Sequence, residues 1–205
     1  MLHFKRSDID AMEKIFRLNL INSCTGYKSA NLIGTQSKEG KTNLAVFSSI
    51  THLGSNPPLI GFVLRPTTVP RDTYRNLKES SLFTVNHIHY KSVADAHHTS
   101  AKYPEDVSEF SKTDFEPEYL DGFQAPFVRD AKVRLGCRFL NEYPIKENNT
   151  LLLVSEIEAI HIEDGILQAD GWLNLEHAGS VSINGLDGYS KPKLIERFVY
   201  AKPTR

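Results

Sequence analysis

The 205-residue sequence predicts a mainly β fold, an antiparallel barrel of about seven strands with short helical insertions. The apolar stretches are short and follow one another through turns, which is typical of antiparallel strands and not of a βαβ sheet. Ala131 to Leu140 alternates apolar and charged residues, the pattern of a strand with one face in the core. The length fits one domain, so we expect residues 1–205 to form a single unit.

The first part of the chain predicts a helical start followed by a hairpin. Apolar residues in Ser7 to Leu20 follow a helical spacing. Ser29 to Thr35 and Thr42 to Ile50 are then expected as two strands around a turn at Gly40. Leu53 to Pro58 contains two prolines, which cannot donate to a strand ladder, so we expect pairing to stop there.

Strands and short helices alternate in the next part. Leu59 to Leu64 is a short apolar run that predicts a buried strand, and Ser81 to Ile88 predicts another. Between them, Arg71 to Lys78 favours a helix, and Asp72 or Thr73 is the expected N-cap because both side chains can accept from free backbone N–H groups.

The second half predicts two helical pieces and more strands. Helical pieces are expected at Lys91 to Lys102 and at Pro104 to Phe110. Leu151 to Ile162 is a long strand whose alternation slips near Ser155, which indicates a bulge. A short returning strand is expected at Ile166 to Ala169.

Composition excludes several classes of protein. Lys plus Arg is 24 and Asp plus Glu is 25, so the basic excess typical of nucleic-acid binding is missing. No apolar run is long enough to span a membrane, and the first residues do not resemble a secretory signal. Two isolated cysteines, Cys24 and Cys137, fit a reducing compartment, so we expect a cytoplasmic protein. No metal site is expected, because no carboxylate or cysteine stands at ligand spacing beside the histidines.

The most informative stretch runs from Thr42 to Tyr74. A strand with several small polar residues in an apolar run is unusual, because a buried hydroxyl without a partner costs about 1–3 kcal/mol. Arginines and a further hydroxyl follow at the predicted helix start, where backbone N–H groups and a guanidinium would form an anion site. A solvated strand face and surface salt bridges are the alternative. The cluster favours a planar ligand that carries a phosphate, and its members are Asn43, Ser48, Ser49, Thr51, Arg65, Arg71 and Thr73.

Several stretches resemble the flavin reductase-like family of FMN-binding split barrels. They are SANLIGT, NLAVFSSITHLGSNPPLIGFV, RPTTVPRDTYRNL and SLFTVNHI, which cover Ser29 to Ile88 almost without a break. The stretches SAKYPEDVSEF and YSKPKLIERF are similar to the flavoredoxin-like branch. The resemblance implies a Greek-key split barrel, a homodimer, and FMN held non-covalently at the barrel edge near the dimer interface.

The resemblance also implies roles for particular residues. The strand from Asn43 to Thr51 would hold the flavin ring and ribityl chain, and Arg65, Arg71 and Thr73 would hold the phosphate. The residues closest to the flavin would be Ala45, Phe47, Ser48 and Ser49, with Asn86 close by. Tyr189 is a candidate for the open face of the flavin, and the alternative is a tail tyrosine packed on the barrel. We name no catalytic residue, because the cofactor itself performs the hydride chemistry.

The function expected from this resemblance is an FMN-binding oxidoreductase. NADH or NADPH would be the transient reductant, and the hydride would pass to bound FMN and on to a small acceptor. The alternative is an FMN-binding electron carrier or flavin-storage protein without a dedicated hydride donor. The irregular insertion from Asp114 to Pro126 also predicts a homodimer, because its aromatic residues need a surface that buries them. These aromatic residues are Phe115, Tyr119, Phe123 and Phe127.

Overall fold

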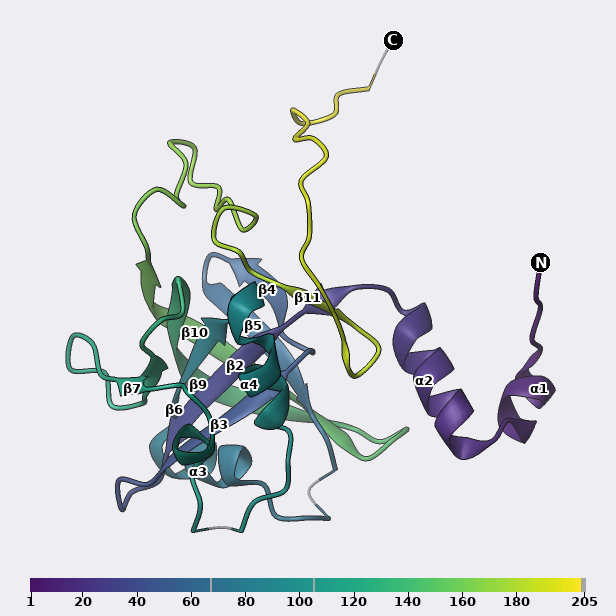
Figure 1. Ribbon diagram of the computed structural model, residues 1–205, viewed down its shortest axis with the longest axis horizontal. Coiled ribbons are helices and arrows are strands. Elements are labelled where there is room, and N and C mark those ends of the chain that lie inside the picture. The colour runs from purple at the N-terminus through teal and green to yellow at the C-terminus, as the bar shows by residue number, and fades with distance from the viewer. Residues whose placement is uncertain (67, 105, 204–205) are drawn as a thin grey trace.

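A seven-stranded antiparallel sheet forms the body of the molecule in this computed structural model, which describes residues 1–66, 68–104 and 106–203 (Figure 1). Its strand order is β3-β2-β6-β9-β10-β5-β4. The strands are β2 (Asn31–Gln36), β3 (Thr42–Phe47), β4 (Thr51–Ser55), β5 (Pro58–Leu64), β6 (Leu82–His87), β9 (Val133–Ile145) and β10 (Thr150–Ile162). This arrangement confirms the predicted antiparallel split barrel.

Two small sheets and several short helices surround this body. One sheet joins β1 (Lys28–Ser29), β11 (Ser182–Asn184) and β12 (Gly188–Ser190), and the other pairs β7 (Pro117–Glu118) with β8 (Phe127–Val128). The helices are α1 (Arg6–Ala11), α2 (Lys14–Cys24), α3 (Asp72–Ser80), α4 (Val93–His98) and the 3₁₀ turns η1 (Tyr90–Ser92) and η2 (Glu109–Lys112). Among the described residues, no helix combines the length and the apolar character needed to cross a membrane.

Apolar side chains pack on the sheet in separate clusters. One contains Phe62, Phe83 and Leu153, all fully buried, together with Leu77 of α3. A second lies against β2 and β3 and is completed by the second half of the chain. Its members include Leu32, Leu44, Ile88, Ala96, Val128, Val181 and Ile183. Because α3 inserts Leu77 into the first cluster, the start of this helix has a fixed position relative to the sheet.

The expectation that pairing stops within Leu53 to Pro58 is wrong. Strand β4 runs to Ser55 and pairs with β5, with Ser55 opposite Pro58. Asn56 and Pro57 form the turn, so Pro57 has no ladder bond to donate. Pro58 is the first residue of β5, a position at which proline is tolerated in a sheet.

Other predicted boundaries also change. The N-terminal segment forms two helices, α1 and α2. Asp72 and Thr73, the expected N-caps of α3, are wrong because Arg71 occupies the N-cap position, and its side chain makes no capping bond. Strand β3 ends at Phe47 and not at Ile50, and α4 ends at His98 and not at Lys102. The expected strand from Ile166 to Ala169 is reduced to one bridge between Leu167 and Leu173.

The later strands agree better with the sequence. The predicted bulge in β10 is confirmed by a register shift between Val154 and Ser155. The expected helical piece from Pro104 to Phe110 forms only a turn at Val107 and the start of η2, and Glu105 within it lies outside the described residues.

The aromatic residues of the insertion are mostly buried by their own chain. Phe127 is fully buried, and the ring of Phe123 packs against it with 5.6 Å between centroids. Phe115 packs against the second core cluster, which leaves Tyr119 as the exposed member. The reason given for a homodimer from this insertion is therefore wrong, and support for a dimer has to come from another surface.

Candidate functional site

The segment after β3 carries small polar residues that the sequence singles out, with Ser48 and Ser49 directly after the strand and Thr51 at the start of β4. Ser49 is used by the fold, because its hydroxyl accepts from the backbone N–H of Val63 and donates to the Val63 carbonyl, both at 3.1 Å. Ser48 is partly buried and Thr51 is exposed, and neither hydroxyl bonds to any described residue. The two hydroxyls on either side of Ser49 are therefore available to a ligand.

The start of α3 has the features of an anion site. Arg71 stands at the N-cap position with extended backbone, and no side chain caps the helix. As in every α-helix, the backbone N–H groups of the first turn have no acceptor within the helix, and they lie at the positive end of the helix dipole. The Nε atom of Arg71 is buried and has no hydrogen-bond partner among the described residues. A group with several acceptor oxygens would satisfy both sets of donors.

A buried polar network holds this helix start against the strand. Asn43 Nδ2 donates to Thr73 Oγ1 at 3.1 Å and to Thr35 Oγ1 at 3.4 Å. Asn76 Nδ2 donates to the same Thr35 oxygen at 3.0 Å. All four residues are buried, so their bonds are sheltered from water and fix the distance between β2, β3 and α3.

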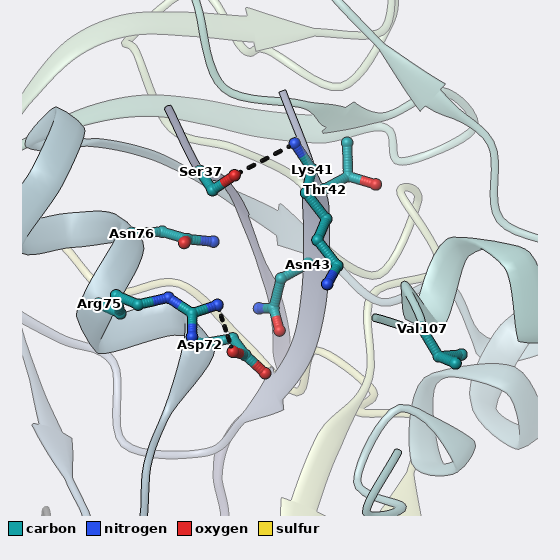
Figure 2. Close-up of a pocket in the computed structure, with 8 residues that line it drawn as sticks. All are labelled: Ser37, Lys41, Thr42, Asn43, Asp72, Arg75, Asn76 and Val107. Carbon is teal, nitrogen blue, oxygen red and sulfur yellow. Dashed lines mark hydrogen bonds and ion pairs between the residues drawn. The ribbon is translucent and has the colours of Figure 1, made fainter. Parts of the chain in front are cut away.

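Figure 2 shows the small polar pocket that borders this network. Asn43 on β3 and Asn76 on α3 point toward one another, and Asp72 and Arg75 form an ion pair at 2.7 Å beside them. The Oδ1 atom of Asn76 is buried and lacks a partner in the described part of the chain. The pocket is narrow and lies between the β2–β3 turn and α3. We therefore infer that its residues support the site.

Asn76 is a member of this site that sequence reasoning missed. Thr73, Asn76 and Leu77 are the buried residues of α3, so one face of the helix turns toward the sheet. A polar residue three positions after Thr73, next to the apolar Leu77, is the signal that could have revealed it.

The other predicted site residues occupy different places. Arg65 is exposed directly after β5, and Ala45 and Phe47 are partly buried on β3. The phenol of Tyr189 is 3.4 Å from His97 Nδ1, and its ring packs edge-on against the same imidazole. Burial, followed by nearby Asp187, raises the pKa of Tyr189. Tyr189 thus contacts His97 of α4, and its place at the open face of a flavin stays a prediction.

Asn86 does not fit a ligand-binding role in this structure. It is fully buried in β6, and its Nδ2 donates to the Leu32 carbonyl at 3.2 Å and to Thr84 Oγ1 at 2.9 Å. Its Oδ1 accepts from the backbone N–H of Val128 at 2.9 Å. These bonds join β6, β2 and β8, so the amide serves the fold and has no surface left for a cofactor.

The histidines do not converge on a metal centre. Within residues 1–66, 68–104 and 106–203, no three His, Cys, Asp or Glu side chains are grouped so that they could hold an ion. His87 instead lies beside Ser180, with 3.3 Å between Nδ1 and Oγ. Burial lowers its pKa to about 4, so it is neutral at pH 7.

Comparison with known proteins places this geometry in a family. A family model described as a flavin reductase like domain matches residues 27–195, which include every strand of the body. The chain belongs to the flavin reductase-like family. The matched region contains both the β3 end and the start of α3.

Solved structures share the fold across almost the whole chain. A candidate flavin reductase with a split barrel domain from Shewanella frigidimarina is 40% identical, with a TM-score of 0.95 over 98% of this chain and 100% of that one. Nitrilotriacetate monooxygenase component B from Bacillus cereus is 23% identical, with a TM-score of 0.83 over 98% of each chain, and shows the fold alone. Among curated relatives, the protein YwrF of Bacillus subtilis is 26% identical over 84% of this chain and 86% of its own length.

Proposed function

We propose that this member of the flavin reductase-like family binds FMN and uses NADH or NADPH to reduce it. The observation that carries the proposal is the uncapped start of α3, where the buried Nε of Arg71 has no protein partner. A side chain usually caps such a helix start, and a buried guanidinium nitrogen without a partner is costly. A terminal phosphate would satisfy the free helix N–H groups and the guanidinium together.

The neighbouring residues suit the rest of the cofactor. The free hydroxyls of Ser48 and Thr51 can bond to the ribityl chain or to the polar edge of a planar ring. Phe47 contributes an apolar surface at the end of β3. In this proposal Ser49 positions the loop through its two bonds to Val63 and does not contact the ligand.

Two solved structures of flavin proteins support the choice of FMN. A protein from Thermus thermophilus described as FMN-binding shares the fold with a TM-score of 0.70 at 19% identity. Flavoredoxin of Desulfovibrio vulgaris shares it with a TM-score of 0.74 at 18% identity. When bound, FMN would supply the hydride chemistry, and the residues of this chain would bind and orient it.

The proposal includes a cytoplasmic homodimer. Cys24 is a free, exposed thiol and Cys137 is a free, buried one, which fits a reducing compartment. Support for the dimer comes from exposed apolar side chains outside the barrel, which include Ile15 and Phe16 of α2. Large apolar side chains exposed next to one another mark an interface more often than a solvated face.

The test is reconstitution followed by reduction. The purified protein is incubated with FMN, freed of unbound flavin, and its ligand is identified by mass after heat release. We expect about one FMN per chain, and a failure to retain FMN contradicts the proposed cofactor. Rapid anaerobic mixing with NADH and with NADPH then tests the reductant. Fast loss of flavin absorbance with either nucleotide supports a reductase, whereas reduction by dithionite alone supports the electron carrier.

A further inference from the structure

Tyr74 contributes a backbone donor to the start of α3. The first backbone bond within this helix runs from the Arg75 N–H to the Arg71 carbonyl at 3.0 Å. The three N–H groups before it, at positions 72 to 74, have no acceptor among the described residues. The last of the three belongs to Tyr74. This residue therefore presents its N–H group at the place where the proposed function puts a phosphate.

The side chain of Tyr74 is bound to Glu142, which lies far along the chain on β9. The phenol donates to Glu142 Oε1 at 3.0 Å. Burial, followed by this bond, raises the pKa of Tyr74, so the phenol keeps its proton and can donate at neutral pH. Lys78, one turn later in α3, has its Nζ atom 3.5 Å from the same oxygen. The Oε2 atom of Glu142 is buried and has no partner in the described part of the chain. The partners of this carboxylate therefore both lie on α3.

A bulge in β9 turns Glu142 toward α3. The register shift between β9 and β10 leaves Leu140 without an opposite residue, and such an extra residue re-aims the side chains beyond it. Glu142 then lies directly opposite Leu153, and opposite residues point to the same face of a sheet. Leu153 is fully buried in the cluster into which α3 inserts Leu77. The carboxylate therefore points to the face of the sheet that α3 covers, whereas a strand without the bulge would turn it to the other face.

Two side-chain bonds hold the first turn of α3 from different directions. Thr73 accepts from Asn43 on β3, and Tyr74 donates to Glu142 on β9. Successive residues of an α-helix are about 100° apart around its axis, so the two bonds together resist both rotation and tilt of the first turn. The direction of the free N–H groups is therefore set by β9 as well as by β3, and pre-organised donors bind a ligand without a further cost of ordering.

We infer that Glu142 is a positioning residue for the phosphate of the cofactor and acts through Tyr74, whose backbone N–H is one of the phosphate donors. This inference rests on the proposed function and adds a residue of β9 to the site. Glu142 itself does not contact the phosphate, because two anionic groups repel one another. Charge and position thus predict opposite effects when the carboxylate is removed. Loss of its charge alone would tighten the binding of FMN, whereas loss of its bond to Tyr74 would weaken it.

The first test is Tyr74→Phe, which removes only the phenol oxygen and changes no charge at neutral pH. Titration of the flavin-free protein, followed by flavin fluorescence, gives the dissociation constants of FMN and riboflavin, and their ratio reports on the phosphate. We expect FMN to bind about three- to tenfold more weakly, while riboflavin changes less than about twofold. Tyr103→Phe is the matched control, because it removes a phenol that bonds to His98 and not to α3, and it should change neither constant.

The second test separates the position of Glu142 from its charge. Glu142→Gln removes the charge but keeps an oxygen that can accept from Tyr74, whereas Glu142→Ala removes both. We expect Glu142→Ala to weaken FMN as much as Tyr74→Phe does, and Glu142→Gln to bind FMN at least as tightly as the wild type. The double variant Tyr74→Phe/Glu142→Ala should be no weaker than either single variant, because each substitution removes the same contact.

The third test needs no flavin. The ¹⁵N-labelled protein is titrated with inorganic phosphate at constant ionic strength, with chloride as the balancing salt, and its amide resonances are followed by nuclear magnetic resonance. We expect the amide of Tyr74 to shift as phosphate binds in the wild type. The same amide should require about three- to tenfold more phosphate for half of its shift in Tyr74→Phe and in Glu142→Ala. The Tyr103→Phe control should follow the wild type.

Three outcomes overturn the inference: equal changes of FMN and riboflavin in Tyr74→Phe, tighter FMN binding in Glu142→Ala, and an amide of Tyr74 that does not respond to phosphate. Urea denaturation confirms that each variant is folded under the conditions of the titrations. Arg71→Ala shows which proposal has failed. If it weakens FMN and riboflavin alike, the phosphate site of the proposed function is wrong. If it weakens FMN alone while Tyr74→Phe does not, only the positioning role of Glu142 is wrong.

Discussion

Asn43 on β3 donates a hydrogen bond to Thr73 at the start of α3, with 3.1 Å between Nδ2 and Oγ1. This buried bond joins β3, the strand directly before the segment with the free hydroxyls, to the helix that presents Arg71. Two parts of the proposed cofactor site, which lie thirty residues apart in the chain, are therefore held at a fixed separation. Pre-organised donors of this kind bind a ligand without a further cost of ordering.

Thr73→Val tests this connection. The substitution keeps the shape of the side chain but removes the acceptor, which leaves Asn43 with only its longer bond to Thr35. We expect the free energy of unfolding to fall by about 1–3 kcal/mol, measured by urea denaturation. Gln124→Ala, at an exposed position, is the control and should change it by less than about 0.5 kcal/mol. An unchanged midpoint for Thr73→Val would show that the network does not stabilise the fold.

Gly34→Ala tests the close approach of the insertion to β2. A Cβ atom at this position would lie 2.2 Å from the Pro126 carbonyl oxygen and 2.7 Å from Thr84 Oγ1. Because Thr84 already donates to that carbonyl at 2.6 Å, neither group can move without loss of the bond. We expect a loss of about 1–3 kcal/mol or more in urea denaturation. Gly54→Ala, whose nearest neighbour would be at 3.2 Å on the edge strand β4, should cost less, and equal losses would contradict this account.

His87 predicts a dependence of stability on pH. Burial lowers its pKa to about 4 in the folded protein, whereas an unfolded histidine titrates near 6.5. The unfolded chain therefore binds more protons between these values, and the free energy of unfolding should fall as pH drops from about 6.5 to 4, by up to about 3 kcal/mol. Burial raises the pKa of Glu109, which acts in the opposite direction by stabilising the fold at low pH.

The variant His87→Asn isolates this contribution. It cannot gain a proton in the unfolded chain, so its unfolding free energy should fall less steeply between pH 6.5 and 4 than that of the wild type. Urea denaturation at several pH values gives both curves. Parallel curves would mean that His87 does not titrate differently in the two states.

Sequence alone predicted the body of the fold because local signals and pairing agree there. The β2–β3 hairpin and the alternation in β9 follow from turn chemistry and burial on one face. Strand β4 was missed because the two prolines that follow it argue against pairing. Pro57 lies in the turn and Pro58 begins β5, so neither interrupts the pairing of β4. Whether a segment such as β4 forms a strand depends on the strand that pairs with it, and the local sequence pattern does not reveal that partner.

The candidate site was predictable in part. Arg71 and Thr73 lie at the start of a helix, as the sequence predicts, because polar residues there precede an apolar face of the helix. Asn86 was assigned from family resemblance, but its three bonds come from Leu32, Thr84 and Val128, which are far apart in the chain. Whether an amide serves the fold or a ligand depends on such long-range partners.

The central claim is that Arg71 and the start of α3 bind the phosphate of FMN, and a comparison of FMN with riboflavin in Arg71→Ala tests it most directly. Titration followed by flavin fluorescence gives the affinity for each ligand in wild type and variant. A charge-assisted contact is worth about 1.5–3 kcal/mol, so FMN binding should weaken about ten- to a hundredfold while riboflavin, which has no phosphate, is unaffected. Arg138→Ala, which removes a surface ion pair with Glu158, is the matched control and should change neither affinity. Equal losses for FMN and riboflavin in Arg71→Ala would contradict the phosphate assignment.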